Sequence, residues 1–278
     1  MENKGKWTVG ALALLLIMAE GFAAAPPPRE DCSAPPEFTQ SKLVLVGELH
    51  GTQQAPAFIG SAACALAAQG SLVVGLEMPA AEQPRIDAYL GSGGGSKERA
   101  ALTIGEFWGF QDGRASHAML DLIERLRVLK RGGAPLQVLA MDGSTTNSSK
   151  SEAMAVALRR AMQGNPQARV LALMGNIHAR VLPDEAEDDP PVGSRLRDLR
   201  PLAVLAGYGE GEAWVCMDGF CGVHPMSSRW GKGRKHGYYP GQAAWSSYAD
   251  TIHLGTITAS LPVRGAATKQ NQQPWAGK

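Results

Sequence analysis

Two segments of the sequence share one pattern, in which an apolar run is followed by Gly-x-x-His. The run 43–46 precedes the copy that ends at His50, and the run 170–174 precedes the copy that ends at His178. Apolar runs of this kind are typical of buried parallel strands. Because ligands of open α/β sheets bind at the carboxyl ends of the strands, we expect the two histidines to share one site.

Polar side chains stand at the ends of the other strand-like runs as well. Glu48 and Asn176 lie inside the two copies of the pattern, Glu77 ends a second apolar run, and Asp142 ends a third. Parallel strands end at one edge of a sheet, so these side chains should converge. Glu48 and Asn176 could instead cap turns, and Asp142 could begin one. A buried Glu77 would be costly without a partner, which favours a site over a structural hydrogen bond.

Two histidines and one carboxylate form the ligand set of a catalytic divalent metal site with one position left for water. We therefore predict His50, Glu77 and His178 as ligands of Zn, Mn or Co. The ion would lower the pKa of its water and polarise a carbonyl, while Glu48 would orient the water or act as general base. A metal-free alternative uses a histidine, oriented by a carboxylate, to activate water for attack on an ester.

Strand-like and helix-like segments alternate along the chain. This order predicts an α/β fold with a mostly parallel sheet flanked by helices and joined by right-handed crossovers. Residues 79–134 are too many for one crossover helix, so we expect a helical cap inserted between the second and third strands. The predicted strands are 43–46, 72–76, 136–141, 169–174, 202–206 and 251–261, and the predicted helices are 55–69, 83–90, 117–130, 149–163 and 193–200.

Residues 1–25 have a basic start, a short apolar core and small residues for cleavage. This pattern predicts a secretory signal and hence a periplasmic or secreted protein, with no stable membrane span after signal cleavage. We expect a Pro-rich leader over 26–40, a single domain over 41–265 and a disordered tail over 266–278. The formal charge of +1 gives no reason to expect nucleic acid as a partner.

The four cysteines would enter an oxidising compartment, where disulfides form. Cys216 and Cys221 flank an Asp-Gly turn, so they could face each other across a hairpin. Cys32 and Cys64 remain as the second pair, although Cys64 lies in an apolar helical stretch and could be a buried thiol.

Several familiar catalytic motifs are missing from the sequence. G-x-S-x-G does not occur, which argues against an ordinary serine hydrolase, and there is no H-E-x-x-H and no P-loop. The glycine-rich tract 91–96 follows no strand-like run, so it predicts a flexible linker.

Three motifs together resemble a superfamily that joins erythromycin esterases, TraB/Tiki proteins and ChaN-like haem-binding uptake proteins. They are the strand ends Gly47–Gly51, Leu76–Pro79 and Gly175–His178. The stretch Phe107–Phe110 also resembles the ChaN-like branch. The resemblance covers about residues 41–207, and it implies an α/β core with a helical cap and a cleft at the strand ends.

The resemblance implies two different uses of this cleft. Tiki-like members are metal-dependent proteases, and their active residues map by position onto Glu48, His50, Glu77 and His178. Erythromycin esterase-like members use a similar set to hydrolyse a lactone. The first hypothesis is therefore an exported, metal-assisted hydrolase of an ester, amide or peptide bond, with a small molecule or a peptide as substrate.

ChaN-like members bind haem, so the second hypothesis is a haem-binding protein of iron uptake without turnover. A haem site needs an apolar slot and an axial His or Tyr. Within such a slot Trp108 and Tyr239 are the predicted haem contacts, although these rings could equally be core. ChaN proteins are lipid-anchored, whereas no cysteine directly follows the apolar run here. The aromatic residues that could line a slot are Trp108, Phe110, Tyr238, Tyr239 and Trp245.

Overall fold

The computed structural model describes Met1 and residues 32–182 and 188–265. The predicted signal after Met1, the start of the leader and the tail 266–278 lie outside the described residues. The strands are β1 (Leu43–Glu48), β2 (Leu72–Pro79), β3 (Leu136–Asp142), β4 (Arg169–Gly175), β5 (Leu202–Gly207), β6 (Glu210–Met217), β7 (Phe220–Ser227), β8 (Gly237–Tyr239) and β9 (Asp250–His253). The helices are α1 (Pro36–Gln40), α2 (Gln54–Ala67), η1 (Ala80–Glu82), α3 (Gln83–Gly91), α4 (Ser96–Thr103), η2 (Glu106–Gly109), α5 (His117–Arg131), α6 (Lys150–Gly164), α7 (Val192–Arg195) and η3 (Arg197–Leu199).

Seven strands form one sheet in the order β3-β2-β4-β1-β5-β9-β8, and β6 and β7 form a separate hairpin. All neighbours in the large sheet are parallel except β8, which runs antiparallel to β9. The predicted fold class, a mostly parallel sheet flanked by helices, is confirmed. The two strands that carry the Gly-x-x-His pattern, β1 and β4, are direct neighbours, and Glu48 aligns with Gly175.

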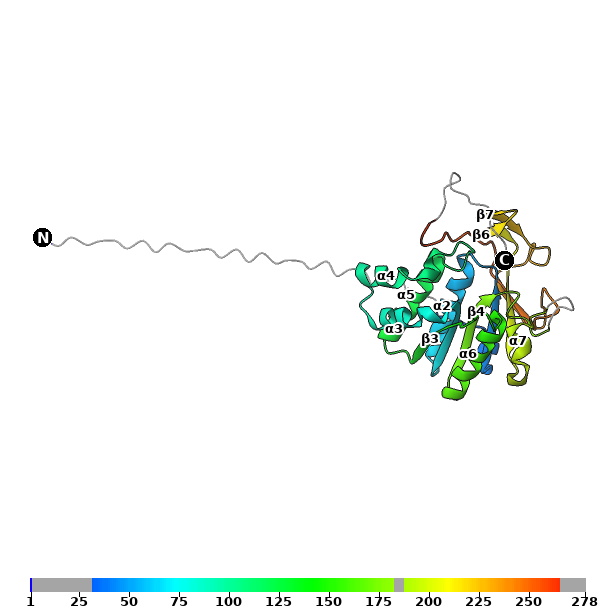
Figure 1. Ribbon diagram of the computed structural model, residues 1–278, viewed down its shortest axis with the longest axis horizontal. Coiled ribbons are helices and arrows are strands. Elements are labelled where there is room, and N and C mark those ends of the chain that lie inside the picture. Colours follow the sequence, from blue (N-terminus) through cyan, green and yellow to red (C-terminus); the bar gives the residue numbers. More distant parts are fainter. Residues whose placement is uncertain (2–31, 183–187, 266–278) are drawn as a thin grey trace. The chain divides into compact units, whose positions relative to one another are not determined.

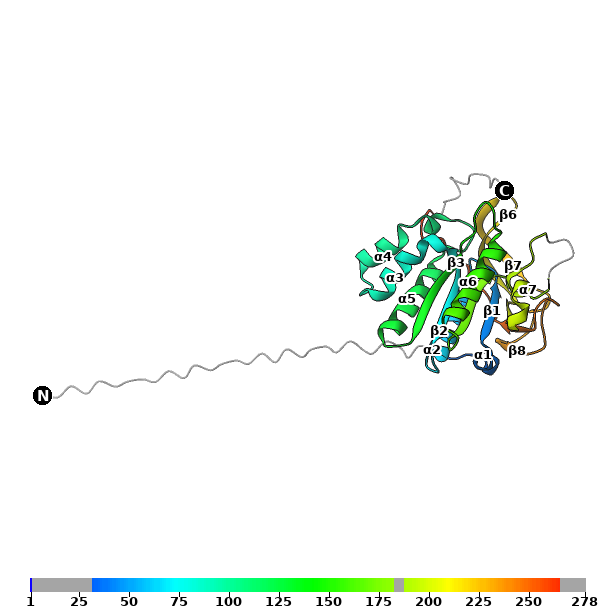
Figure 2. The same cartoon turned by 60° about the horizontal axis from the view of Figure 1, so that its bottom comes forward.

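Helices cover both faces of the sheet (Figures 1 and 2), which explains why the strand sequences are apolar without alternation. Along β1, Val44 and Val46 belong to the apolar cluster that includes α2 and α5. Leu43 and Leu45 belong to the cluster on the other face, which includes α6. Each of these four side chains is at most 1% exposed, so β1 lies in the centre of the core.

The segment between β2 and β3 is helical, as predicted. Within it, α5 packs on α2 and α3, and α3 packs on α4, so these helices lie together at one side of the sheet (Figure 1). Helix α4 was not predicted. It begins at Ser96, where the glycine-rich linker ends. The loop 110–116 between η2 and α5 reaches the carboxyl edge of the sheet, where the backbone of Gly51 donates to the carbonyl of Gly113 at 3.1 Å.

Three predicted boundaries were wrong. Residues 36–40 of the Pro-rich leader form α1, since a proline suits a first helical turn and Phe38 is fully buried in the core. The predicted strand 251–261 is ordered as β9 only over Asp250–His253, because Gly255 adopts a positive φ of 78° and turns the chain away. The predicted helix 193–200 is divided into α7 and η3.

Both predicted disulfides are present. Cys216 and Cys221 form a directly opposed pair in the β6–β7 hairpin, and Cys32 is bonded to Cys64 of α2. The Asp218-Gly219 turn has positive φ at both residues (53° and 83°), as a tight hairpin turn requires. In the described part of the chain, no helix combines the length and the apolar character needed to cross a membrane.

Candidate functional site

The strand ends form one pocket of about 510 Å³. All four side chains predicted as catalytic lie in its lining. Both hypotheses placed their chemistry at this edge, and the structure brings these residues together there. The lining consists of Glu48, Leu49, His50, Glu77, Asp112, Arg114, Lys150, Gly175, Asn176, Ile177, His178, Val215, Cys216 and Met217.

Glu77 is the central charge of the site. It lies in the buried part of β2 near its carboxyl end and is only 4% exposed. One carboxylate oxygen accepts a hydrogen bond of 2.7 Å from the backbone N–H of Gly175, and the other lies 3.2 Å from Nζ of Lys150 and 3.6 Å from Arg114. Burial alone would raise the pKa of Glu77, but protonated His50 and Lys150 lower that pKa well below its ordinary value. Glu77 is therefore ionised at neutral pH.

His50 is held between two carboxylates. Its Nδ1 lies 3.1 Å from Oε1 of Glu48, and its Nε2 lies 3.5 Å from Oε2 of Glu77. Burial alone would lower the pKa of His50, but the two carboxylates raise it to about 10. His50 is therefore an imidazolium at neutral pH and donates from both ring nitrogens. Oε1 of Glu48 contacts Nδ1 of His50, so Glu48 orients the His50 ring. Burial raises the pKa of Glu48.

His178 is in the opposite protonation state. Its Nδ1 lies 2.9 Å from Oγ of Ser151, and its Nε2 lies 3.9 Å from Oε1 of Glu77. Burial lowers the pKa of His178, so the ring is neutral at neutral pH. Nδ1 of His178 is paired with the Ser151 hydroxyl, whereas Nε2 lies beyond hydrogen-bond distance of Glu77 and is the ring nitrogen left to meet a bound water or substrate.

Four charged or polar residues of the site were missed in the sequence: Asp112, Arg114, Lys150 and Ser151. Lys150 and Ser151 lie in the first turn of α6, directly after its N-cap Ser149, whose hydroxyl accepts from the N–H of Glu152. A helix that begins just after a strand end presents its first turn at the carboxyl edge of the sheet. The predicted start of this helix could therefore have indicated Lys150 and Ser151 as site residues. Arg114 comes from the helical insertion, and its sequence context gave no such signal.

The remaining predicted residues have supporting roles. Asp142 lies 3.7 Å from Nζ of Lys150 and accepts from the N–H of Ser144 at 3.1 Å, so it both begins a turn and faces the site. Asn176 acts through its backbone, whose N–H donates to the carbonyl of Glu48 at 2.9 Å. Gly175 supplies space, since a Cβ there would lie 2.9 Å from Nε2 of His50.

The donor set does not suit a divalent ion. A metal site needs ligands whose lone pairs are free to face the ion. Here Glu77 already faces two cations and a backbone N–H, and each ring nitrogen of His50 faces a carboxylate. No group of three His, Cys, Asp or Glu side chains is arranged to hold a metal ion within residues 32–182 and 188–265. The metal site therefore stays a prediction that this geometry does not favour.

The two predicted haem contacts lie away from the pocket. Trp108 is fully buried in the core and packs edge-on against Phe107, with ring centroids 5.2 Å apart. Tyr239 lies in β8, at the far edge of the sheet, and packs against Trp230 and the guanidinium of Arg234. The sequence could not separate a core ring from a pocket ring, because both are apolar positions near a helix or strand end.

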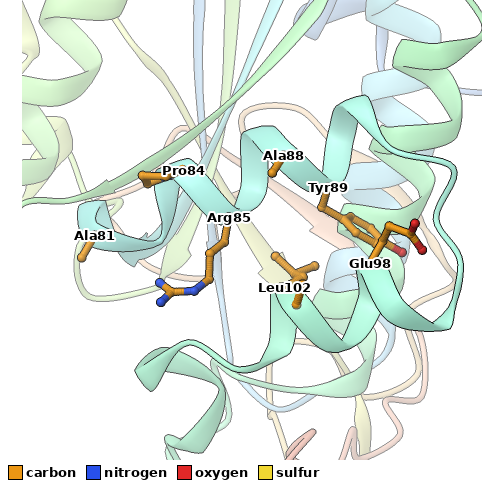
Figure 3. Close-up of a pocket in the computed structure, with 8 residues that line it drawn as sticks. Ala81, Pro84, Arg85, Ala88, Tyr89, Glu98 and Leu102 are labelled. Carbon is orange, nitrogen blue, oxygen red and sulfur yellow. The ribbon is translucent and has the colours of Figure 1, made fainter.

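A second pocket, of about 490 Å³, lies between α3 and α4 (Figure 3). Its lining is mostly apolar and includes none of the predicted site residues. Tyr89, which lines it, directs its hydroxyl to Glu124 at 2.6 Å, so that polar group is already paired. This pocket offers no histidine for acid–base chemistry. The residues that line it are Ala81, Pro84, Arg85, Ala88, Tyr89, Glu98, Ala101 and Leu102.

Solved structures share this fold. One is a mutant of the erythromycin esterase EreC in its open conformation, with 11% identity and a TM-score of 0.53 over 84% of this chain and 93% of that chain. Another is a protein from Bacillus cereus, with 11% identity and a TM-score of 0.55 over 82% and 92% of the two chains. No family model matches the sequence, and the search of curated proteins finds no match. At this identity the similarity establishes a shared fold and nothing about the reaction.

Proposed function

We propose that this protein is a hydrolase that cleaves an ester or amide bond by general acid–base catalysis. His178 acts as the base and is oriented by Ser151, while His50 stabilises the negative charge that develops in the reaction and is held by Glu48 and Glu77. Two disulfides suit a protein of an oxidising compartment, so we place the activity in the periplasm or outside the cell.

The observation that carries the proposal is a pair of histidines in opposite protonation states within one pocket. His50 has a pKa raised to about 10, whereas the pKa of His178 is lowered. Both rings lie within 4 Å of the same Glu77 carboxylate. Titratable groups whose environments separate their pKa values in this way are a common arrangement for acid and base roles.

The chemistry uses no group beyond the substrate and one water. Nε2 of His178 takes a proton from the water as its oxygen bonds to the carbonyl carbon. The carbonyl oxygen becomes negative and is stabilised by the positive charge of the nearby His50 imidazolium, whose two N–H groups stay with Glu48 and Glu77. When the bond to the leaving group breaks, His178 returns its proton to the departing oxygen or nitrogen. The products are a carboxylic acid and an alcohol or amine, and both histidines regain their starting protonation states.

An ester assay tests this proposal. We expect the purified protein to hydrolyse p-nitrophenyl acetate, and His178→Gln to lower kcat/KM about 10²- to 10⁴-fold, the usual contribution of a general base. His50→Gln should lower kcat/KM on the order of 10²-fold, because it removes the positive charge beside the developing oxyanion. The control His117→Gln changes an exposed histidine outside the pocket. Equal activity of wild type and His178→Gln would contradict the proposal.

Chelation separates this proposal from the metal-assisted version. The residue-only mechanism predicts unchanged kcat/KM after dialysis against EDTA. A metal-assisted hydrolase would lose activity on dialysis and recover it with added Zn²⁺, Mn²⁺ or Co²⁺. That second outcome would replace His178 as base with a metal-bound water.

A further inference from the structure

One wall of the pocket is apolar, and part of it comes from the β6–β7 hairpin, which lies outside the main sheet. Val215 and Met217 of the β6–β7 hairpin line the pocket together with Leu49 and Ile177. Met217 is 44% exposed and Ile177 is 53% exposed. Two large apolar side chains are thus left open to solvent at the same pocket as the proposed catalytic histidines. Covering such surface stabilises a complex by about 25 cal/mol per Å².

The hairpin is fixed against the segments that carry the site. The backbone N–H of Trp214 donates to the carbonyl of Gly51 at 2.9 Å, and its indole N–H donates to the carbonyl of Gln111 at 2.7 Å. Gly51 and Gly113 have φ of 72° and 90°, and a Cβ on Gly51 would overlap the carbonyl of Trp214. This close approach joins the hairpin to the chain just after His50. The wall therefore keeps a set position relative to the catalytic groups.

A covalent link closes the same wall. Cys216 also lines the pocket, and its disulfide partner is Cys221 on β7. Val215 packs with Ile257 and Leu49 on the inner side of the hairpin. Met217, next to Cys216 along β6, is thereby held at the pocket on a strand that cannot separate from its partner.

The cations of the pocket are already neutralised. Arg114 makes hydrogen bonds of 2.6 and 3.0 Å with the carboxylate of Asp112. Lys150 lies 3.2 Å from Glu77 and 3.7 Å from Asp142. An anionic substrate group would have to displace one of these partners, whereas an uncharged apolar group would meet the exposed wall directly.

We infer that the hairpin wall of Val215 and Met217, with Ile177, is the subsite for an uncharged apolar group next to the scissile bond. This inference rests on the proposed function and specifies its substrate class as neutral esters or amides with an apolar acyl or alkyl part. Specificity then comes from a hairpin that is separate from the sheet that carries the histidines.

A chain-length series tests the subsite. Wild-type kcat/KM should rise on the order of tenfold from p-nitrophenyl acetate to the butyrate, since each buried CH₂ contributes about 0.8 kcal/mol. Met217→Ser should reduce the butyrate-to-acetate ratio of kcat/KM severalfold. Val223→Ser is the matched control, because Val223 lies on β7 of the same hairpin, is also 44% exposed and does not line the pocket. The control should keep the wild-type ratio.

The outcomes separate the two proposals. If the wild type hydrolyses neither ester, the proposed function fails. If it hydrolyses both with equal kcat/KM, or if both serine variants change the ratio equally, the subsite inference is refuted while the hydrolase proposal stands. A double Cys216→Ser, Cys221→Ser variant gives a second measurement, since releasing the strands should also lower the ratio. An unchanged ratio in that variant would show that the disulfide does not hold the wall.

Discussion

Replacing Glu77 by Gln should destabilise the fold and lower the pKa of His50 together. The substitution keeps the size of the side chain but removes the charge that faces His50, Lys150 and Arg114 at 3.2 to 3.6 Å. The rise of the His50 pKa from 6.5 to about 10 corresponds to ~5 kcal/mol at 1.36 kcal/mol for each pKa unit. That value is an upper bound, because the His50 side chain is 21% exposed and Glu48 contributes part of it.

We therefore expect Glu77→Gln to lower the free energy of unfolding by about 3 kcal/mol at pH 6, as removal of one partner from a buried ion pair does. Urea denaturation followed by circular dichroism measures this loss, and the Hε1 NMR signal of His50 reports its pKa. Glu82→Gln is the matched control, because Glu82 is 3% exposed and lies outside the pocket. The control should leave the His50 pKa at its wild-type value.

The contributions of His50 and Glu77 to the free energy of unfolding change with pH in opposite directions. A raised pKa in the folded state makes the His50 contribution complete below pH 6.5 and lost as pH rises towards about 10. The lowered pKa of Glu77 makes its contribution complete above about pH 4.5 and lost in acid. The loss caused by Glu77→Gln should thus be largest between these values. A loss below 1 kcal/mol at pH 6, or a His50 pKa unchanged by the substitution, would refute the reasoning.

Three further predictions concern the base, its support and the sheet edge. Hydrolytic kcat/KM should rise with pH through a pKa below 6.5, as His178 loses its proton, and fall near pH 10, as His50 loses its proton. A rise through a pKa above 6.5 would contradict this. Ser151→Ala should lower kcat about tenfold with little change in KM and Ser151→Thr should restore it, because a hydroxyl orients the base. Gln83→Leu should lower the free energy of unfolding by about 1–2 kcal/mol in urea denaturation, because the Gln83 amide pairs with a carbonyl and an N–H of the edge strand β3 at 2.9 and 2.8 Å. The same variant should aggregate faster by light scattering, and an unchanged rate would show that this edge needs no cover.

The sequence by itself determined the strands that carry the site, the edge at which they end and the four central side chains. Apolar runs and the Gly-x-x-His repeat are local patterns, and parallel strands must end at one edge. Those two facts were sufficient to predict that His50, His178, Glu48 and Glu77 share one site. The disulfide of Cys216 and Cys221 followed from equally local turn chemistry.

Only the tertiary structure decided how these groups differ from one another. The sheet order places β4 between β1 and β2, so the carboxylate of Glu77 meets the N–H of Gly175 across 98 residues of sequence. Burial and the nearest charges then set opposite protonation states in His50 and His178, although both follow the same motif. Distances between remote segments depend on strand order and packing, and a local pattern does not encode them. For the same reason the sequence could not place Trp108 in the core or the β6–β7 hairpin at the pocket.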